Sequence, residues 1–304
     1  MSFRDEEHLI AQVDEELSIK LAKDLKEAAS TLTTQEVRFL VDTYYNYQNN
    51  RIRAANQVRA MAVSGEPHLV IDWLNKQNRG LEASIKGALD IYTRSKPLGR
   101  WSTSITGIGP IISAGLMSHI DFKIANTAGK IFSFAGIAPG QEWKKGEKRP
   151  WNASLKVLTF KAGDCFVKFH NHKNDHYGKY YVLRKAEEAA KNLKGEYAGQ
   201  AAEILSKKTF RKDTKAKEAY EAGKLPDGHI HARARRYATK IFLSHFHTVG
   251  FWLEHHVAPP APYPIAHMGH LDYIPPPNVE LFPDLYEALK ETDYYKRGGC
   301  GGKS

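Results

Sequence analysis

The stretch TTQEVRFLVDTYYNYQNNRIRAANQVRAMA, residues 33–62, decides the fold class of this chain. Thr33 and Glu36 have the spacing of a capping box, in which each side chain accepts a hydrogen bond from the other residue's backbone N–H at a helix start. Apolar side chains then recur at helical intervals, at Val37, Leu40, Val41 and Tyr44. The stretch therefore predicts one long amphipathic helix.

A second long helix is expected over residues 68–95, after a break at residues 64–67 and before Pro97. Its apolar face is formed by Leu81, Ile85, Ala88, Leu89 and Tyr92. Two neighbouring helices with one apolar stripe each are typical of an antiparallel hairpin or of a dimerising coiled coil. We therefore expect residues 1–97 to form a helical or coiled-coil region through which the protein forms homo-oligomers.

The rest of the chain also predicts helices, because the alternation typical of strands is scarce. Residues 98–257 are expected to form a helical domain, in which the Lys-, Glu- and Ala-rich segment 185–227 is an exposed helical insertion. Half of the fourteen prolines lie between Pro259 and Pro277, so residues 258–304 are expected to form an extended, proline-rich tail. The expected fold class is mainly α.

Charge is unevenly distributed along the chain. The net charge is +10, yet residues 141–250 alone contain 24 Lys and Arg against 12 Asp and Glu. Such a local excess favours a polyanionic partner. No apolar run is long enough to cross a membrane, and the distant Cys165 and Cys300 form no metal-binding motif and suit a reducing compartment. We therefore expect a cytoplasmic, nucleoid-associated protein that binds DNA and no membrane.

Two glycines, Gly107 and Gly109, flank one isoleucine in TGIGPIISAGLMSHI, residues 106–120. A Gly-apolar-Gly turn between two helices lets the backbone approach a phosphate, because no Cβ atom stands in the way. Free N–H groups at the start of the following helix donate to that phosphate, and Pro110 suits its first turn. The pattern is also typical of an ordinary tight turn, but the basic surroundings favour phosphate binding.

This region resembles the C-terminal domain of the insertion-sequence 110/116/902 transposases, which contains a helix-hairpin-helix turn. The resemblance is carried by ITGIGPIISAGLMSHI, IFSFAGIAPG and NASLKVLTF, in that order. The matching residues are Gly107, Ile108, Gly109, Ala135, Gly136, Ile137, Ala138, Pro139, Asn152, Leu155 and Lys156. HARARRYATKIFL resembles the basic closing helix of that domain, and the two long helices resemble the coiled coil before it. The resemblance thus covers residues 33–250.

The sequence departs from that family in two ways. The family's RuvC-like domain, whose acidic residues bind metal, has no room before residue 33, and the position of the family's nucleophilic serine falls near Lys144. Ser154 is the nearest downstream hydroxyl and the candidate catalytic residue, although helix capping is its expected role. We therefore expect a transposase-derived DNA-binding protein without strand transfer.

Two other functions stay open at this point. The first is an active recombinase, transposase or nuclease that uses Ser154, a histidine-bound metal or a RuvC-like partner. The second is a structural protein that assembles through its long helices. The DNA form, and whether a guide RNA accompanies it, also stay open.

The expected DNA contacts combine the glycine turn, a basic loop and two basic helices. They are Gly107, Gly109, Lys144, Lys145, Lys148, Arg149, Lys156, Arg233, Arg235 and Arg236. Three tyrosines interleaved with lysines are candidates for stacking on bases, with core packing as the alternative: Tyr177, Tyr180 and Tyr181.

Histidines and aspartates form two groups with the residue types of a metal site. The first group is His170, His172, Asp175 and His176, and the second is His267, His270 and Asp272. Such groups can hold zinc or another divalent metal. No cysteine joins them, and histidines also bind phosphates, so no cofactor is expected and a divalent metal is the alternative.

Overall fold

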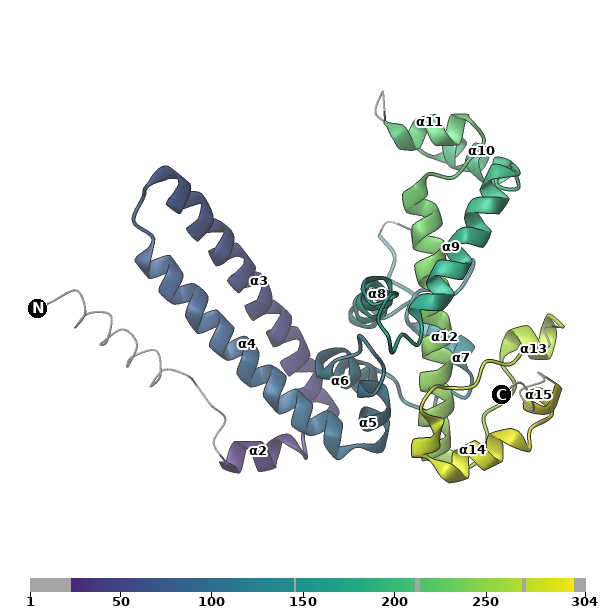
Figure 1. Cartoon of the computed structure of the whole chain (residues 1–304), viewed down its shortest axis with the longest axis horizontal. Coiled ribbons are helices and arrows are strands. Elements are labelled where there is room, and N and C mark those ends of the chain that lie inside the picture. Colours follow the sequence, from purple (N-terminus) through teal and green to yellow (C-terminus); the bar gives the residue numbers. More distant parts are fainter. Residues whose placement is uncertain (1–22, 145, 211–213, 270–271, 298–304) are drawn as a thin grey trace, which may run out of the picture. The chain divides into compact units, whose positions relative to one another are not determined.

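The computed structural model describes residues 23–144, 146–210, 214–269 and 272–297. All regular elements in these ranges are helices, so the prediction of a mainly α protein is confirmed (Figure 1). The chain divides into two compact units. Unit 1 comprises Met1–Thr103 and Gly109–Ile120, and unit 2 comprises Ser104–Ile108 and Asp121–Ser304.

Unit 1 is built on two long helices that run side by side in opposite directions (Figure 1). α3 (Thr34–Ser64) begins with the capping box: Thr33 N–H donates to Glu36 Oε2 at 2.7 Å, and Glu36 N–H donates to Thr33 Oγ1 at 3.3 Å. It ends at Gly65, whose φ of 72° lets the chain turn towards α4 (Leu69–Ser95). α2 (Lys23–Ala29) packs against α4.

The side chains buried between α3 and α4 change from apolar to polar along the two helices. Near the start of α3 the buried side chains are apolar: Val37, Val41, Leu89 and Tyr92. Further out, the buried side chains of α4 are polar: Asn75, Asn78 and Glu82. Arg51 of α3 forms an ion pair with Glu82. The outer part of this helix pair is therefore joined by polar contacts rather than by an apolar core.

Two short helices, α5 (Pro97–Thr103) and α6 (Pro110–His119), complete the described part of unit 1. Trp101 of α5 is fully buried. α6 is joined to α3 by a hydrogen bond from Arg38 Nε to the carbonyl oxygen of Ser118 at 2.8 Å. The helices expected on either side of the glycine turn are therefore both present.

Unit 2 is organised around α12 (Asp227–His255), against which α7 (Ala128–Phe134), α8 (Ala153–Lys168) and α9 (Gly178–Leu193) pack. The largest core side chains are aromatic: Phe166, Tyr177, Phe242 and Phe246. At Gly163, α8 comes so close to α12 that a Cβ atom would stand 2.3 Å from Thr239 Oγ1. This close approach brings charged residues of α8 and α12 to a common surface.

The described part of residues 185–227 is helical, and most of its residues are exposed or half-buried, but it also takes part in a small apolar core. The segment continues α9 and adds α10 (Ala198–Lys207) and α11 (Lys215–Glu221). α10, α11, the turn before α12 and the start of α12 share a small apolar core, built on Ala201, Tyr220, Leu225 and Ile230. Each of these four residues comes from a different segment, so no single stretch displays an apolar stripe.

The expectation of an extended tail is wrong for part of residues 258–269 and 272–297, because short helices alternate there with irregular segments. These ranges contain α13 (Tyr263–His267), η1 (Val279–Leu281), α14 (Pro283–Lys290) and α15 (Asp293–Arg297). Pro283 begins α14 rather than preventing it, because a proline is tolerated in the first helical turn. Leu285 and Leu289 of α14 are fully buried. None of the described helices combines the length and apolar composition that a membrane crossing requires.

Candidate nucleic-acid interface

The two glycines of the 106–120 stretch have different roles in the folded chain. Gly107 has a φ of +91°, and a Cβ atom there would lie 3.1 Å from Cys165 Cβ and 3.2 Å from the Phe169 ring. The fold itself therefore requires a glycine at this position. Gly109 has a φ of −93° and a ψ of 177°, and its Cβ atom would meet no atom within 4 Å. No contact within the described chain requires a glycine there.

Gly109 is the N-cap residue of α6, which begins without a side-chain cap. Pro110 lacks a backbone N–H, and the amides that follow it in the first turn have no acceptor within their own helix. Such amides can bind an anion. The division between the two units falls between Ile108 and Gly109, so this helix start belongs to unit 1.

The basic loop between α7 and α8 presents its cations to solvent. Lys144, Lys148 and Arg149 are exposed, whereas Lys145 lies outside the described residues. The indole N–H of Trp143 donates to the carbonyl oxygen of Glu147 at 2.6 Å, and the Arg149 guanidinium lies 4.8 Å from the Trp143 ring centroid. The loop therefore holds an aromatic ring and a cation together.

At the end of this loop, the Trp151 ring packs against the backbone of Gly136 and against the side chain of Lys156. Gly136 has a φ of 64°, and a Cβ atom there would stand 2.5 Å from the Trp151 ring. On α8, Lys156 Nζ lies 3.9 Å from the centroid of the same ring. Asn152 caps α8 by accepting a hydrogen bond from the backbone N–H of Leu155 at 2.8 Å. Gly136 and Asn152 thus have local structural roles, and Lys156 is held at the surface.

α12 adds two cations to Lys156, and together Lys156, Arg236 and Lys240 form what we call the cationic cluster. Partial burial lowers the pKa of Lys156, and the charges of Arg149 and Arg236 lower it further. Partial burial, followed by the charge of Arg236, lowers the pKa of Lys240. Among the described residues, no carboxylate forms an ion pair with any member of the cluster. The described part of unit 2 therefore gathers three cations, none of which pairs directly with a carboxylate there.

Arg235 and Arg233 occupy different environments beside the cluster. The Arg235 guanidinium lies 3.8 Å from the ring centroid of Phe160 on α8, and Phe160 is exposed. Arg233 instead forms an ion pair with the fully buried Glu188. Burial would raise the pKa of Glu188, but hydrogen bonds from Tyr197 and Arg233 and the charge of Arg184 hold it below its ordinary value. Arg233 thus has a structural partner, unlike the members of the cationic cluster.

Lys240 is a member of the cluster that the sequence-based interpretation missed. It lies four residues after Arg236 on one helix, so its side chain points to the same face. That spacing was visible in the sequence. Lys240 is surrounded in the sequence by apolar residues, which indicate the core-facing side of the helix.

Ser154 does not have the capping role expected of it, because Asn152 caps α8. Ser154 follows in the first turn, where its side chain is exposed. No histidine, lysine or carboxylate of the described residues forms a hydrogen bond with it. No general base from the described part of the chain therefore lies in hydrogen-bond contact with this candidate nucleophile.

The histidine groups do not assemble into a metal site in the described part of the chain, where no three metal-ligating side chains come together. The carboxylate of Asp175 caps α9 by accepting from the backbone N–H groups of Gly178 and Lys179 at 2.7 and 2.6 Å. His170 Nδ1 donates to the carbonyl oxygen of Val167 at 2.7 Å. The remaining candidates are dispersed: His172 and His267 are exposed, His176 is partly buried beside Thr106, Asp272 is exposed, and His270 lies outside the described residues.

The tyrosines proposed to stack on bases pack in the core instead. Tyr177 and Tyr181 are buried, and Tyr180 is half-buried. The Tyr177 hydroxyl donates to His245 Nδ1 at 2.8 Å. The burial of these tyrosines could not be predicted from the sequence, because the lysines between them indicate a solvent-exposed face.

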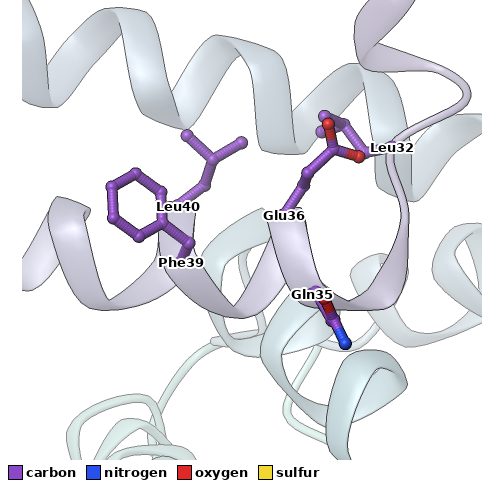
Figure 2. A pocket seen from close by; sticks show the side chains of 5 residues that line it. All are labelled: Leu32, Gln35, Glu36, Phe39 and Leu40. Atoms are coloured by element: carbon purple, nitrogen blue, oxygen red, sulfur yellow. The ribbon is translucent and has the colours of Figure 1, made fainter.

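Unit 1 contains an apolar hollow of about 390 Å³ at the start of α3 (Figure 2). It is lined by Leu32, Gln35, Glu36, Phe39 and Leu40. The carboxylate of Glu36, seen beside Leu32 in Figure 2, is already engaged in the capping box. The lining therefore presents no unengaged catalytic group, and the charged surface of unit 2 is the better candidate site.

A comparison of this chain with protein-family models, with curated proteins and with solved structures finds no match.

Proposed function

We propose that this protein binds DNA through the phosphate backbone, with the cationic cluster of α8 and α12 as its central contact. The observation that carries this proposal is that Lys156, Arg236 and Lys240 lie together without a carboxylate partner among the described residues. Burial and the charge of Arg236 lower the pKa of both Lys156 and Lys240, so the folded chain disfavours the charged form of each lysine. A bound phosphate backbone stabilises the charged forms of these side chains, because its negative charges take the place of the carboxylate partners that they lack among the described residues.

The exposed loop cations Lys144, Lys148 and Arg149 extend this contact, and the first turn of α6 supplies backbone N–H groups for a further phosphate. The resemblance to the transposase domain supports DNA as the polyanion. We propose binding without strand transfer, because lysine occupies the position expected for the family's serine, and no general base among the described residues contacts Ser154.

The dependence of affinity on salt tests this function. Each phosphate contact releases a condensed counterion, so the logarithm of the binding constant should fall linearly with the logarithm of the salt concentration. Fluorescence anisotropy with a labelled DNA over a range of salt concentrations measures this slope. A protein that shows no DNA binding at low salt would not have the proposed function.

Substitution of the two turn glycines separates a structural role from a phosphate contact. Gly109→Val is expected to leave the protein folded, because a side chain at this position meets no atom within 4 Å. Affinity should nevertheless fall for every DNA sequence alike, because the side chain blocks the approach of a phosphate to the backbone. Gly107→Val serves as the contrasting variant, since its positive φ and its contacts with Cys165 and Phe169 predict a loss of stability of about 1–3 kcal/mol.

Thermal melting and DNA binding measured on the same preparations distinguish these effects. If Gly109→Val is folded and binds DNA as tightly as the wild type, the start of α6 makes no phosphate contact. The contribution of the cationic cluster would then be unaffected.

We further propose that a second copy of this chain covers the outer end of the α3–α4 pair. Five large apolar side chains are exposed there: Val63, Leu69, Val70, Trp73 and Leu74. At the same level the pair buries Asn75 and Asn78, the reverse of the usual distribution for an isolated amphipathic helix. By their helical spacing, Leu69, Val70, Trp73 and Leu74 lie on one side of α4, and a cluster of exposed apolar side chains is typical of protein interfaces.

Trp73→Asp is expected to convert the assembled protein to monomers, because it places a charge at the centre of the apolar surface. Size-exclusion chromatography with light scattering measures the mass directly. Phe39→Asp is the matched control, because Phe39 is 69% exposed on α3 but lies outside this surface. A wild-type protein that is monomeric at high concentration would contradict the assembly.

A further inference from the structure

The candidate interface exposes aromatic rings beside its cations. Trp143 in the loop and Phe160 on α8 are 42% and 53% exposed. Each ring contacts a guanidinium group: Arg149 lies 4.8 Å from the centroid of Trp143, and Arg235 lies 3.8 Å from that of Phe160. Scattered exposed aromatics need no explanation, but a guanidinium across one face restrains the orientation of the ring.

These rings and cations belong to one surface of unit 2. Lys156 and Phe160 are one turn apart on α8, so their side chains point to the same side. Arg149 and Arg236 are both near enough to Lys156 for their charges to affect it. Trp143 is linked to this group through Arg149, and Phe160 through Arg235. Aromatic rings and cations therefore alternate from the loop to α12.

We propose that this surface binds an unpaired nucleic-acid strand, with phosphates on the cationic cluster and bases stacked on Trp143 and Phe160. The proposal rests on the DNA-binding function proposed above and specifies the form of the bound strand. In a duplex the faces of the bases are covered by their neighbours, and a protein reaches only base edges and phosphates. Exposed rings add affinity only where base faces are free, and cations next to them track the backbone.

The comparison of a single strand with its duplex tests this inference. We expect the wild-type protein to bind a labelled oligothymidylate more tightly than the same strand annealed to oligodeoxyadenylate, at one salt concentration. Phe160→Leu should weaken single-strand binding about fivefold to a hundredfold, the range for loss of one stacking platform, and should leave duplex binding unchanged. Leucine keeps the side chain apolar and changes no charge, and no charged group of the cationic cluster contacts the Phe160 ring, so folding and the salt slope should be preserved even though Arg235 loses its ring contact.

Phe39→Leu is the matched control, because it removes an exposed phenylalanine ring from α3 in unit 1. Its single-strand affinity should equal that of the wild type. A second readout is photocrosslinking of an oligonucleotide that carries 5-iodouracil, followed by mapping of the attached residue. Crosslinks at Trp143 or Phe160 support stacking.

The outcomes separate this inference from the function on which it rests. Equal wild-type affinity for single strand and duplex, or a Phe160→Leu protein that binds the single strand normally, overturns the stacking inference and leaves backbone binding intact. Absence of binding to either DNA at low salt overturns the proposed function, and the inference with it. Loss of duplex and single-strand binding to the same extent in Phe160→Leu also overturns stacking, because it indicates a disturbed cationic surface.

Discussion

Joint replacement of Lys156, Arg236 and Lys240 by glutamine is expected to weaken DNA binding several hundredfold at about 0.1 M salt, without loss of stability. Each phosphate contact contributes roughly 0.9 to the slope of log affinity against log salt concentration, so three contacts should flatten the slope by about 2–3. Salt-titrated anisotropy with one DNA measures both quantities. The loss should be similar for all DNA sequences, because phosphate contacts carry no base information.

The expected stability of this triple variant follows from the pKa shifts of the cluster. Partial burial and neighbouring positive charges lower the pKa of Lys156 and of Lys240, so the folded state disfavours their charged forms. Glutamine removes the repulsion between these side chains, so the melting temperature should stay unchanged or rise. Lower affinity together with equal or higher stability is the combination expected of residues retained for binding.

A second triple variant controls for net charge. Lys191, Lys207 and Lys290 each form an ion pair with a glutamate on the same helix, and their replacement by glutamine removes the same total charge. This control should retain most of the affinity and most of the salt slope. If both triple variants flatten the slope equally, net charge rather than the cationic cluster accounts for the binding.

Acidification from about pH 6.5 to pH 4 is expected to destabilise unit 2 by about 6 kcal/mol through two buried histidines. Burial lowers the pKa of His245 and of His247 to about 4, from an ordinary value of 6.5. His245 Nε2–H donates to the carbonyl oxygen of Ile274 and Nδ1 accepts from the Tyr177 hydroxyl, while His247 Nε2 donates to the carbonyl oxygen of Ala125. Both rings are therefore neutral in the folded state at neutral pH.

The direction of the effect follows from proton binding. As the pH falls below 6.5, the unfolded chain protonates these histidines while the folded chain does not, so protons favour the unfolded state. The loss amounts to about 3 kcal/mol for each histidine and is complete once the pH has fallen through the folded pKa near 4. For a unit of this size, the melting temperature should fall by about 15 °C over that window.

His247→Gln isolates the contribution of one ring. The glutamine amide can donate to Ala125 in place of Nε2, but it does not titrate, so the pH dependence between 6.5 and 4 should be about halved. His267→Gln is the control, because His267 is exposed and its replacement should leave the pH dependence unchanged. A His247→Gln protein with the full wild-type pH dependence would show that the buried histidines do not cause the acid sensitivity. Thermal melts at a series of pH values measure all three proteins.

The sequence predicted a helix well where capping residues at its start and a glycine or proline at its end lie in the same stretch. The Thr33–Glu36 capping box begins α3, and Gly65 ends it. Pro97 follows α4, whose observed range, Leu69–Ser95, is close to the expected 68–95. These signals act between residues within one turn, so they can be read without the rest of the fold. The small core around Tyr220 and the helices after Pro259 were missed because their apolar residues meet only across several short segments.

The sequence also indicated that the cations cluster in residues 141–250, but it did not indicate which of them pair with a carboxylate in the folded chain. Arg233 and Arg236 lie three residues apart in one basic run, yet Arg233 pairs with Glu188 and Arg236 has no ion-pair partner among the described residues. Glu188 lies on a different helix, far away in the sequence. The sequence therefore could not tell a structural arginine from one available to a ligand.

The sequence by itself determined the mainly α fold, the two long helices of unit 1 and the basic character of residues 141–250, because helix caps, apolar periodicity and net charge are local properties of the chain. Only the tertiary structure decided that Gly107 is required by packing and that Gly109 is not, and that Lys156 of α8 joins Arg236 and Lys240 of α12. The physical reason is that side-chain contacts and burial depend on which helices pack together. Those contacts determine which cations pair with a carboxylate among the described residues and which do not.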